Sequence, residues 1–436
     1  MNKRILENII WFTLILLFII ILTGCTDVSS KIEVLNKPII EETVNKANEL
    51  ESLTMEEKLK DFEYLYNLFK ENYPFFEVNK RLNGIDWLGN KEMYIEKIKN
   101  TTTDKEFSEA IEEILDDLNN GHVHLIDKEY FAYTYVSSTL PENNLLPWAE
   151  ALENEVVFNR YDFDRSEIEN IKNEIYDMIS NSNSETNTVQ AFKTSIIIPD
   201  EVAYIHINSM DGSRVEKDGI EIRKFYEEVR DYDKLIIDIR GNSGGSDNYW
   251  IENIIEPLAN KPITIEYYGF ARGDYGEPFF QAKGLDFKPI TDLNKDILNK
   301  VPSDIRENFD KYYLFVHTIK PKDPVGFNGK IYLIVDSAVY SSSESFAAFC
   351  KDSGFATIIG ETTGGDGRGI NPVFFSLPYS GLAGRFSAVL CLNGDYTINE
   401  EVKTIPDIYV NAYGPMPLYN FSHDQAVQYV IKDKTH

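Results

Sequence analysis

The chain has 436 residues, which is enough for a catalytic domain and a smaller appended domain. Hydrophobic residues make up 43% of the chain and charged residues 26%, which is the composition of a globular protein rather than of a disordered one. The 71 acidic and 43 basic side chains give a net charge of −28. This balance argues against a nucleic-acid partner, because such a surface cannot neutralise phosphates, and it favours a solvated acidic surface.

Residues 1–25 have the features of a bacterial signal peptide. A basic start precedes an apolar stretch over 9–22, which is too short for a comfortable membrane span. Residues 22–25 read Leu-Thr-Gly-Cys and resemble a lipobox, in which the cysteine is lipidated. We therefore predict a lipid anchor on Cys25 that holds the protein to the cell membrane, on its extracytoplasmic face. A plain signal anchor is the alternative and gives the same orientation; residues 26–52 are polar and predict a tether.

Residues 53–128 predict a small helical domain. Capping boxes at 54–57 and 103–106 each open a segment with apolar residues at helical spacing. The second segment stops near Gly121, which suits a left-handed helix C-cap. His122 follows directly, at the place where a rigid helix ends.

The following residues, 129–195, contain an aromatic stretch and a predicted helix over 164–179, and they form an insertion whose role the sequence does not indicate. From 196 to 411 strands alternate with helices, which predicts an α/β body. Residues 262–312 look loop-rich, and 412–436 a C-terminal tail. The predicted strands are 202–207, 235–239, 331–335, 356–359, 373–375 and 386–392.

A serine-rich turn follows the strand predicted over 331–335. Residues 341–346 read Ser-Ser-Ser-Glu-Ser-Phe and lead into a helical pattern. A sharp strand-to-helix turn around a serine exposes its hydroxyl and directs free helix N–H groups toward whatever the hydroxyl attacks; a plain serine-rich N-cap is the alternative. Among six histidines, His122 and His124 follow a helix end in a distant segment, which makes them the candidate bases. Metal binding by His122 and His124 is the rival interpretation, but no third ligand accompanies them at familiar spacing.

Five motifs occur in the order found in one known family. They are Leu118–His122, Ile236–Gly245, Ser341–Phe346, Gly360–Gly365 and Ile405–Ile408. Together they resemble the C-terminal processing (tail-specific) and tricorn-type serine peptidases, over about residues 55–411. The resemblance implies a helical domain on an α/β core like that of the ClpP/crotonase fold.

The resemblance also implies catalytic roles for residues of the serine turn and of the glycine-rich turn. The family nucleophile stands three residues before the glutamate, which selects Ser341 before Glu344. The oxyanion donors would be the backbone N–H groups of Ser342 and Gly244, with Gly245 as the alternative to Gly244.

The base distinguishes two branches of the family. The processing branch uses a Ser–Lys dyad, but the matching position here is Asp366. The tricorn-like branch takes a histidine and a carboxylate, which implies His122 as the base and Glu401 as the group that orients it, with Glu400 a close alternative. We expect Asp366 to lie on its turn outside the proton-transfer path, because its charge would repel the oxyanion. Its serving as the orienting carboxylate is the competing possibility.

The sequence therefore predicts a membrane-tethered, extracytoplasmic serine endopeptidase that acts on peptides or proteins without a metal or cofactor. Residues 129–195 lack the Gly-Leu-Gly-like carboxylate loop of a PDZ domain, so no PDZ domain is evident. A family member without activity that binds peptide or cell-wall material is the alternative function. A solute-binding lipoprotein is a third, and it leaves the ordered motifs unexplained. The oligomeric state stays open.

Overall fold

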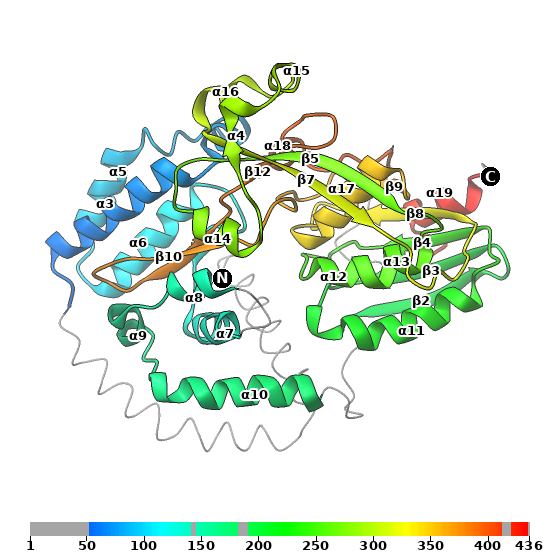
Figure 1. Ribbon diagram of the computed structural model, residues 1–436, viewed down its shortest axis with the longest axis horizontal. Helices are drawn as coiled ribbons and strands as arrows, with labels where there is room; N and C mark the ends of the chain where they lie inside the picture. Colours follow the sequence, from blue (N-terminus) through cyan, green and yellow to red (C-terminus); the bar gives the residue numbers. More distant parts are fainter. Residues whose placement is uncertain (1–51, 141–144, 182–190, 412–419, 435–436) are drawn as a thin grey trace.

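The computed structural model describes residues 52–140, 145–181, 191–411 and 420–434. The predicted signal peptide, the lipid anchor on Cys25 and nearly all of the tether lie outside these residues. Two bodies are visible in Figure 1, a helical block on one side and a parallel sheet on the other, and the strands β5 and β7 run between them.

The helical block begins with the two capping boxes expected from the sequence. Thr54 and Thr103 each accept a hydrogen bond from the third helical N–H, and their own backbone N–H groups donate to the carboxylates at 57 and 106. The helices of this block are α3 (Met55–Asn72), α4 (Phe76–Asn83), α5 (Lys91–Lys99), α6 (Asp104–Asp116), α7 (Lys128–Ser138), α8 (Leu146–Glu150), α9 (Glu155–Arg160), the short 3-10 helix η2 (Arg165–Glu167) and α10 (Ile168–Asn181).

The end of α6 differs from the expectation. The residue in the left-handed region is Asn119, with φ 52°, and not Gly121. Gly121 is required for another reason, because a Cβ there would lie 3.2 Å from the ring of Tyr340. The glycine thus allows the histidine segment to approach the turn that carries the serines.

The core is a six-stranded sheet in the order β13-β9-β8-β4-β3-β2, in which only β2 is antiparallel. Side chains alternate between two apolar layers: Ile205, Leu235 and Leu333 face one layer, and Tyr204 and Ile334 the other. The strands are β2 (Phe192–Ile198), β3 (Val202–Ile207), β4 (Lys234–Asp238), β8 (Lys330–Val335), β9 (Thr357–Gly360) and β13 (Ile408–Tyr409). The predicted α/β core is confirmed.

Helices cover both faces of this sheet. On the first face lie α11 (Val215–Glu228), α12 (Asp247–Trp250) with the π-helical turn after it, and α17 (Ser342–Ser353). The second face is covered by α19 (Gln425–Lys432), whose Val427 and Val430 are fully buried. The segment 412–436, expected to be a tail, therefore contributes a packed helix to the core.

The expectation of a loop-rich segment over 262–312 is wrong. The long strand β5 (Ile263–Ala271) pairs along its whole length with β7 (Lys311–Ile319). These strands belong to a second sheet in the order β12-β5-β7-β6, with β6 (Lys288–Pro289) and β12 (Leu390–Cys391). The short helices α13 (Glu256–Leu258), α14 (Glu277–Ala282), α15 (Lys295–Leu298), α16 (Ser303–Asn308) and α18 (Asn399–Val402) lie in the connections.

A third, small sheet joins the helical block to the core. Its order is β1-β11-β10, formed by β1 (His124–Leu125), β11 (Ala383–Phe386) and β10 (Val373–Ser376). The ring of Phe69 from α3 packs on Phe375 and Phe386 of this sheet, with ring centroids 5.5 and 4.9 Å apart. This junction fixes the position of the segment that carries His122.

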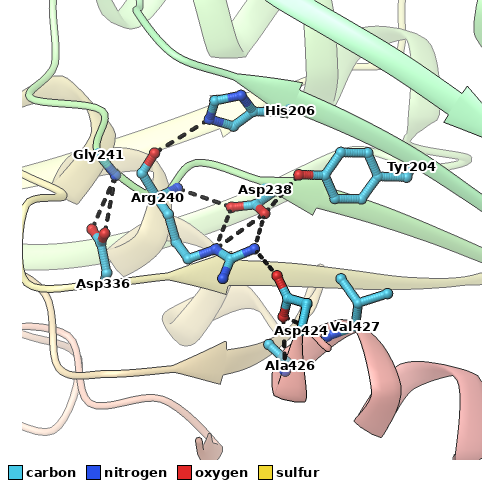
Figure 2. A network of polar contacts seen from close by, with 9 residues as sticks. All are labelled: Tyr204, His206, Asp238, Arg240, Gly241, Asp336, Asp424, Ala426 and Val427. Carbon is cyan, nitrogen blue, oxygen red and sulfur yellow. Dashed lines mark hydrogen bonds and ion pairs between the residues drawn. The ribbon is translucent and has the colours of Figure 1, made fainter. Parts of the chain in front are cut away.

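A buried ion-pair network anchors the glycine-rich turn after β4, as Figure 2 shows. The guanidinium of Arg240 is 3% exposed and donates to Asp238 and, at 2.6 Å, to Asp424 at the start of α19. The next N–H, that of Gly241, donates to Asp336 in the turn after β8. One arginine thus ties the C-terminal helix to the turn that faces the serines.

Candidate active site

The candidate site lies at the carboxyl ends of three neighbouring parallel strands, β4, β8 and β9. Ser341 follows β8 and is the N-cap of α17, with φ 58° and ψ −127°. A serine in this region is strained by about 1–3 kcal/mol, and such strain persists only where neighbours enforce it. The N–H of Ser341 donates to the carbonyl of Gly365 at 3.3 Å, and its carbonyl accepts from Ser345 at 2.9 Å.

His122 joins the serine to a carboxylate. Its Nε2 lies 3.2 Å from Ser341 Oγ, and its Nδ1 lies 2.8 Å from Asp366 Oδ2. Because an ionised carboxylate can only accept, Nδ1 carries the proton and Nε2 keeps a lone pair for the serine hydroxyl. The backbone N–H of His122 donates to Asn120 Oδ1, which fixes the backbone that carries the imidazole ring. The imidazole is therefore in the tautomer that can accept a proton from Ser341.

Asp366 is surrounded by donors. Besides the imidazole, Asn120 Nδ2 and Ser387 Oγ each donate to its Oδ2 at 2.9 Å, and the hydroxyl of Tyr340 donates at 3.3 Å. Burial acts to raise the pKa of Asp366, but His122, Asn120 and Ser387 outweigh it and hold the pKa below its usual value. The carboxylate is thus ionised where the histidine needs a negative partner.

The expectation that Glu401 orients His122 is wrong. Both oxygens of Glu401 accept from Arg81, at 2.8 and 2.6 Å, near the protein surface. The expectation that Asp366 lies outside the proton-transfer path is wrong as well. Asp366 faces Nδ1, the side of the ring away from the serine, so the argument from oxyanion repulsion does not apply to it.

Glu400 lies near the triad but does not bind the histidine. Its Oε1 accepts from Asn120 at 3.2 Å, so one amide group bridges Glu400 and Asp366. Although the residue as a whole is half-buried, its other oxygen, Oε2, is buried without a partner among the described residues. Burial and the charge of Asp366 raise the pKa of Glu400 well above its usual value. Burial and the neighbouring charge thus both favour the protonated form of Glu400.

The glycine-rich turn lies against the nucleophile. A Cβ on Gly244 would stand 2.8 Å from Ser341 Cβ, so only glycine fits there, with φ 111°. Asn242 organises the turn: its Oδ1 accepts from Ser343 Oγ at 2.8 Å and from the Gly244 N–H at 3.0 Å. The Gly244 N–H is therefore occupied.

The remaining N–H groups near the serine differ from Gly244. In the part of the chain that the structure describes, neither the N–H of Ser342, at the first position of α17, nor that of Gly245 donates to a protein acceptor. These two groups are the better pair of candidate oxyanion donors. Among the donors considered from the sequence, Ser342 and the alternative Gly245 thus have N–H groups without a protein acceptor, whereas Gly244 does not.

Three polar residues around Asp366 were missed in the sequence. Asn120 lies inside the motif Leu118–His122, so its position beside the histidine was the available signal. Tyr340 directly precedes the nucleophile and packs against the His122 ring at 5.0 Å between centroids. Ser387, just beyond β11, had no signal at all, because only the three-dimensional fold brings it to 3.3 Å from His122 Nδ1.

The alternative of a metal site at His122 and His124 finds no support. The described residues contain no cluster of three or more His, Cys, Asp or Glu side chains arranged to hold a metal ion. His124 Nδ1 bonds the carbonyl of Leu125, and its Nε2 accepts from Arg385. Both ring nitrogens of His124 are therefore engaged with protein groups.

Comparison with protein families agrees with the motif order. The model of peptidase family S41 matches residues 201–410, and the model of the tricorn protease C1 domain matches residues 55–116. The chain belongs to peptidase family S41. This family places the chain among serine peptidases, in the group of C-terminal processing proteases. The family models found no PDZ domain.

Solved structures share the fold of this S41 chain at low sequence identity. A candidate peptidase from Parabacteroides merdae is 18% identical with a TM-score of 0.51, covering 82% of this chain and 91% of that one. Mature CPAF bound to lactacystin is 13% identical with a TM-score of 0.51, covering 81% and 94%. A mutant of CPAF reaches a TM-score of 0.53 at 11% identity, covering 88% and 99%. No curated protein matches the chain.

Proposed function

We propose that this S41 chain is an active serine endopeptidase that hydrolyses peptide bonds through an acyl-enzyme on Ser341. The observation that supports it most is the continuous line of hydrogen bonds from Ser341 Oγ through the His122 ring to Asp366. Nucleophile, base and orienting group stand in the order that acyl transfer needs.

In the first step His122 Nε2 removes the proton of the Ser341 hydroxyl as Oγ attacks the carbonyl carbon of the scissile bond. The ring becomes an imidazolium, which the negative charge of Asp366 stabilises through Nδ1–H. When the tetrahedral intermediate collapses, the C–N bond breaks and Nε2–H protonates the leaving amine. A water then repeats the sequence on the ester, which releases the new carboxylate and restores the serine.

The charge that develops on the carbonyl oxygen needs donors that are already in place. The N–H groups of Ser342 and Gly245 would supply them, the first aided by the positive end of the α17 dipole. Removing one such donor typically costs about 10²–10³ in kcat. Because both are backbone groups, this part of the mechanism depends on the conformation of the two turns rather than on side chains.

The substrate class follows from the reaction, namely a peptide or an unfolded protein segment. The location rests on the sequence alone: a lipid on Cys25 would hold the body to the cell membrane on its extracytoplasmic face. No helix in the described ranges is long and apolar enough to cross a membrane. Globomycin-sensitive processing and radiolabelled palmitate incorporation, lost in Cys25→Ser, would test the anchor.

The catalytic proposal is tested by a fluorophosphonate probe that reacts with activated serines. We expect stoichiometric labelling of the purified protein and, by peptide mass mapping, a modified Ser341. Ser341→Ala should abolish both labelling and peptide hydrolysis without changing the thermal unfolding midpoint by more than a few degrees. A folded wild-type protein that neither reacts with the probe nor cleaves a broad peptide library would instead favour the inactive, peptide-binding alternative.

A further inference from the structure

Arg385 lies beside the candidate triad without belonging to it. It is on β11, two residues before Ser387, whose hydroxyl donates to Asp366. Across the small sheet it pairs with His124, which is two residues after His122. Arg385 is therefore close in sequence to a residue that binds Asp366, and its strand partner His124 is close in sequence to His122. Both relations place its side chain beside the triad.

The guanidinium of Arg385 is held in a fixed orientation by neutral groups. Its Nε donates to His124 Nε2 at 2.9 Å, and its Nη1 donates to the hydroxyl of Tyr130 at 2.8 Å. It also lies 5.3 Å from the centre of the Tyr130 ring. Burial and the charge of Arg385 lower the pKa of His124 to about 4, so His124 is a neutral acceptor at physiological pH and adds no positive charge.

Within the described ranges, this cation has no carboxylate partner. The chain has 71 acidic residues, yet among the residues that the structure describes none forms an ion pair with Arg385. Three other arginines with little exposed surface each have such a partner: Arg214 pairs with Asp218, Arg240 with Asp238, and Arg368 with Asp352. In the same part of the chain, half-buried guanidinium groups without an ion pair also occur at Arg160 and Arg272, and Arg272 uses its donors on the carbonyls of Tyr73 and Lys70. Arg385 differs because its only partners there are two neutral side chains and because it lies beside the candidate triad.

The remaining donors define the ligand. A guanidinium has five N–H groups in a planar fork, and two of them are used by His124 and Tyr130. The fork fits a planar carboxylate, and arginine is preferred over lysine for such paired contacts. The site is next to the triad, so the carboxylate must arrive with the peptide that is cleaved.

We propose that Arg385 is a specificity-determining residue that binds a carboxylate of the substrate peptide close to the scissile bond. This inference rests on the proposed peptidase function. Two sources supply the same chemistry: the α-carboxylate at the end of the peptide, or the side chain of an Asp or Glu. The bond forms in the ground state and persists through the reaction, so its loss raises KM more than it lowers kcat.

The test compares matched peptides with wild-type protein and Arg385→Gln. One pair differs only in a C-terminal carboxylate or amide; the other pair is amidated and differs only in Glu or Gln, scanned through the positions that flank the cleaved bond. In one of the two pairs we expect the wild type to favour the carboxylate peptide about 10- to 100-fold in kcat/KM, the range for hydrogen bonds to charged groups. Arg385→Gln should reduce this preference to within twofold of unity.

A matched control is Arg165→Gln. Arg165 also stacks on an aromatic ring of the helical block, 4.7 Å from the centre of Phe158, and it touches no residue of the candidate site. The Arg165→Gln substitution removes the same charge and should leave the preference for the carboxylate peptide unchanged. This control separates binding by Arg385 from a general change in the field of an acidic protein.

The outcomes are distinguishable. If the wild type cleaves no peptide, the proposed function fails. If it cleaves peptides but discriminates in neither pair, or if Arg385→Gln keeps the discrimination, the role of Arg385 is refuted while the peptidase stands. Should Arg385→Gln fail to fold, Arg385→Lys keeps the charge but loses the fork, so its preference should fall severalfold. An unchanged preference in Arg385→Lys would overturn the proposal.

Discussion

Replacing Asp366 by Asn tests the corrected triad most directly. The substitution keeps the shape of the side chain and removes its charge. At the position of Oδ2 three other donors converge, from Asn120, Ser387 and Tyr340, so the amide oxygen must occupy this position and the NH₂ group the other. If the new amide were inverted, its NH₂ group would face the NH₂ group of Asn120, and two donors cannot bond each other. His122 therefore keeps its tautomer, and the variant isolates the effect of the charge.

The magnitude follows from the separation of the charges. The Nδ1–Oδ2 distance is 2.8 Å, which places the centres of the imidazolium and carboxylate charges ~4 Å apart. At an effective dielectric constant of about 20, two unit charges at this separation attract by about 4 kcal/mol. Since each 1.36 kcal/mol is tenfold in rate, kcat should fall about 10³-fold. An inverted amide with the wrong tautomer would cost about 10⁴-fold, the loss known for this change in the chymotrypsin triad.

The assay is steady-state hydrolysis of a fluorogenic peptide together with the rate of fluorophosphonate labelling, both at neutral pH. Circular dichroism confirms that the variant is folded. Glu401→Gln is the matched control, because its carboxylate bonds Arg81 and lies away from the histidine, and it should retain kcat within about threefold. The reasoning is refuted if Asp366→Asn keeps activity within tenfold while Glu401→Gln loses a thousandfold.

The other predictions concern neighbouring residues. Ser343→Ala should stay reactive toward the probe, unlike Ser341→Ala, but should lose about 1–2 kcal/mol of stability in urea unfolding, because its buried hydroxyl holds Asn242. Glu400→Gln should keep near-normal kcat. Because folding raises the pKa of Glu400, the stability that its protonated form contributes is lost as pH rises above the unfolded pKa of about 4.5. The melting temperature of the variant should therefore gain on that of the wild type as pH rises above this value and not below it; a constant difference contradicts this. Asp424→Asn should lower the free energy of unfolding by about 2–3 kcal/mol, since Arg240 then keeps only one carboxylate, and an unchanged urea midpoint contradicts this.

Local sequence patterns predicted the elements whose causes are local. Both capping boxes, the alternating strands and helices of the core, and the turn at Ser341 depend on residues within a few positions of one another. The pairing of β5 with β7 does not, because 52 positions separate partners such as Ile265 and His317. The packing of α19 likewise depends on an apolar sheet face assembled from distant strands.

The residues of the candidate site were likewise predictable only in part. The order of the motifs indicated Ser341 and His122, and the structure brings them within 3.2 Å. The choice among Asp366, Glu400 and Glu401 failed because it depends on which donors surround each carboxylate, and those donors come from several separate segments of the chain. Ser387 contacts Asp366 from just beyond β11 and Asn120 from the histidine segment, and Arg81 binds Glu401 from α4. No spacing in the sequence encodes these three contacts.

The electrostatics of the site explain why only one of the two neighbouring acids can serve the histidine. Asp366 and Glu400 share the amide of Asn120, and two ionised carboxylates so close in a protein interior would repel each other strongly. The negative charge is best stabilised on the carboxylate that accepts the most hydrogen bonds. Asp366 has four around one oxygen, whereas Glu400 has one and leaves an oxygen buried without a partner among the described residues. An ionised Asp366 and a protonated Glu400 are therefore one coupled arrangement: the first orients and stabilises the imidazolium, and the neutral state of the second keeps that charge from being opposed.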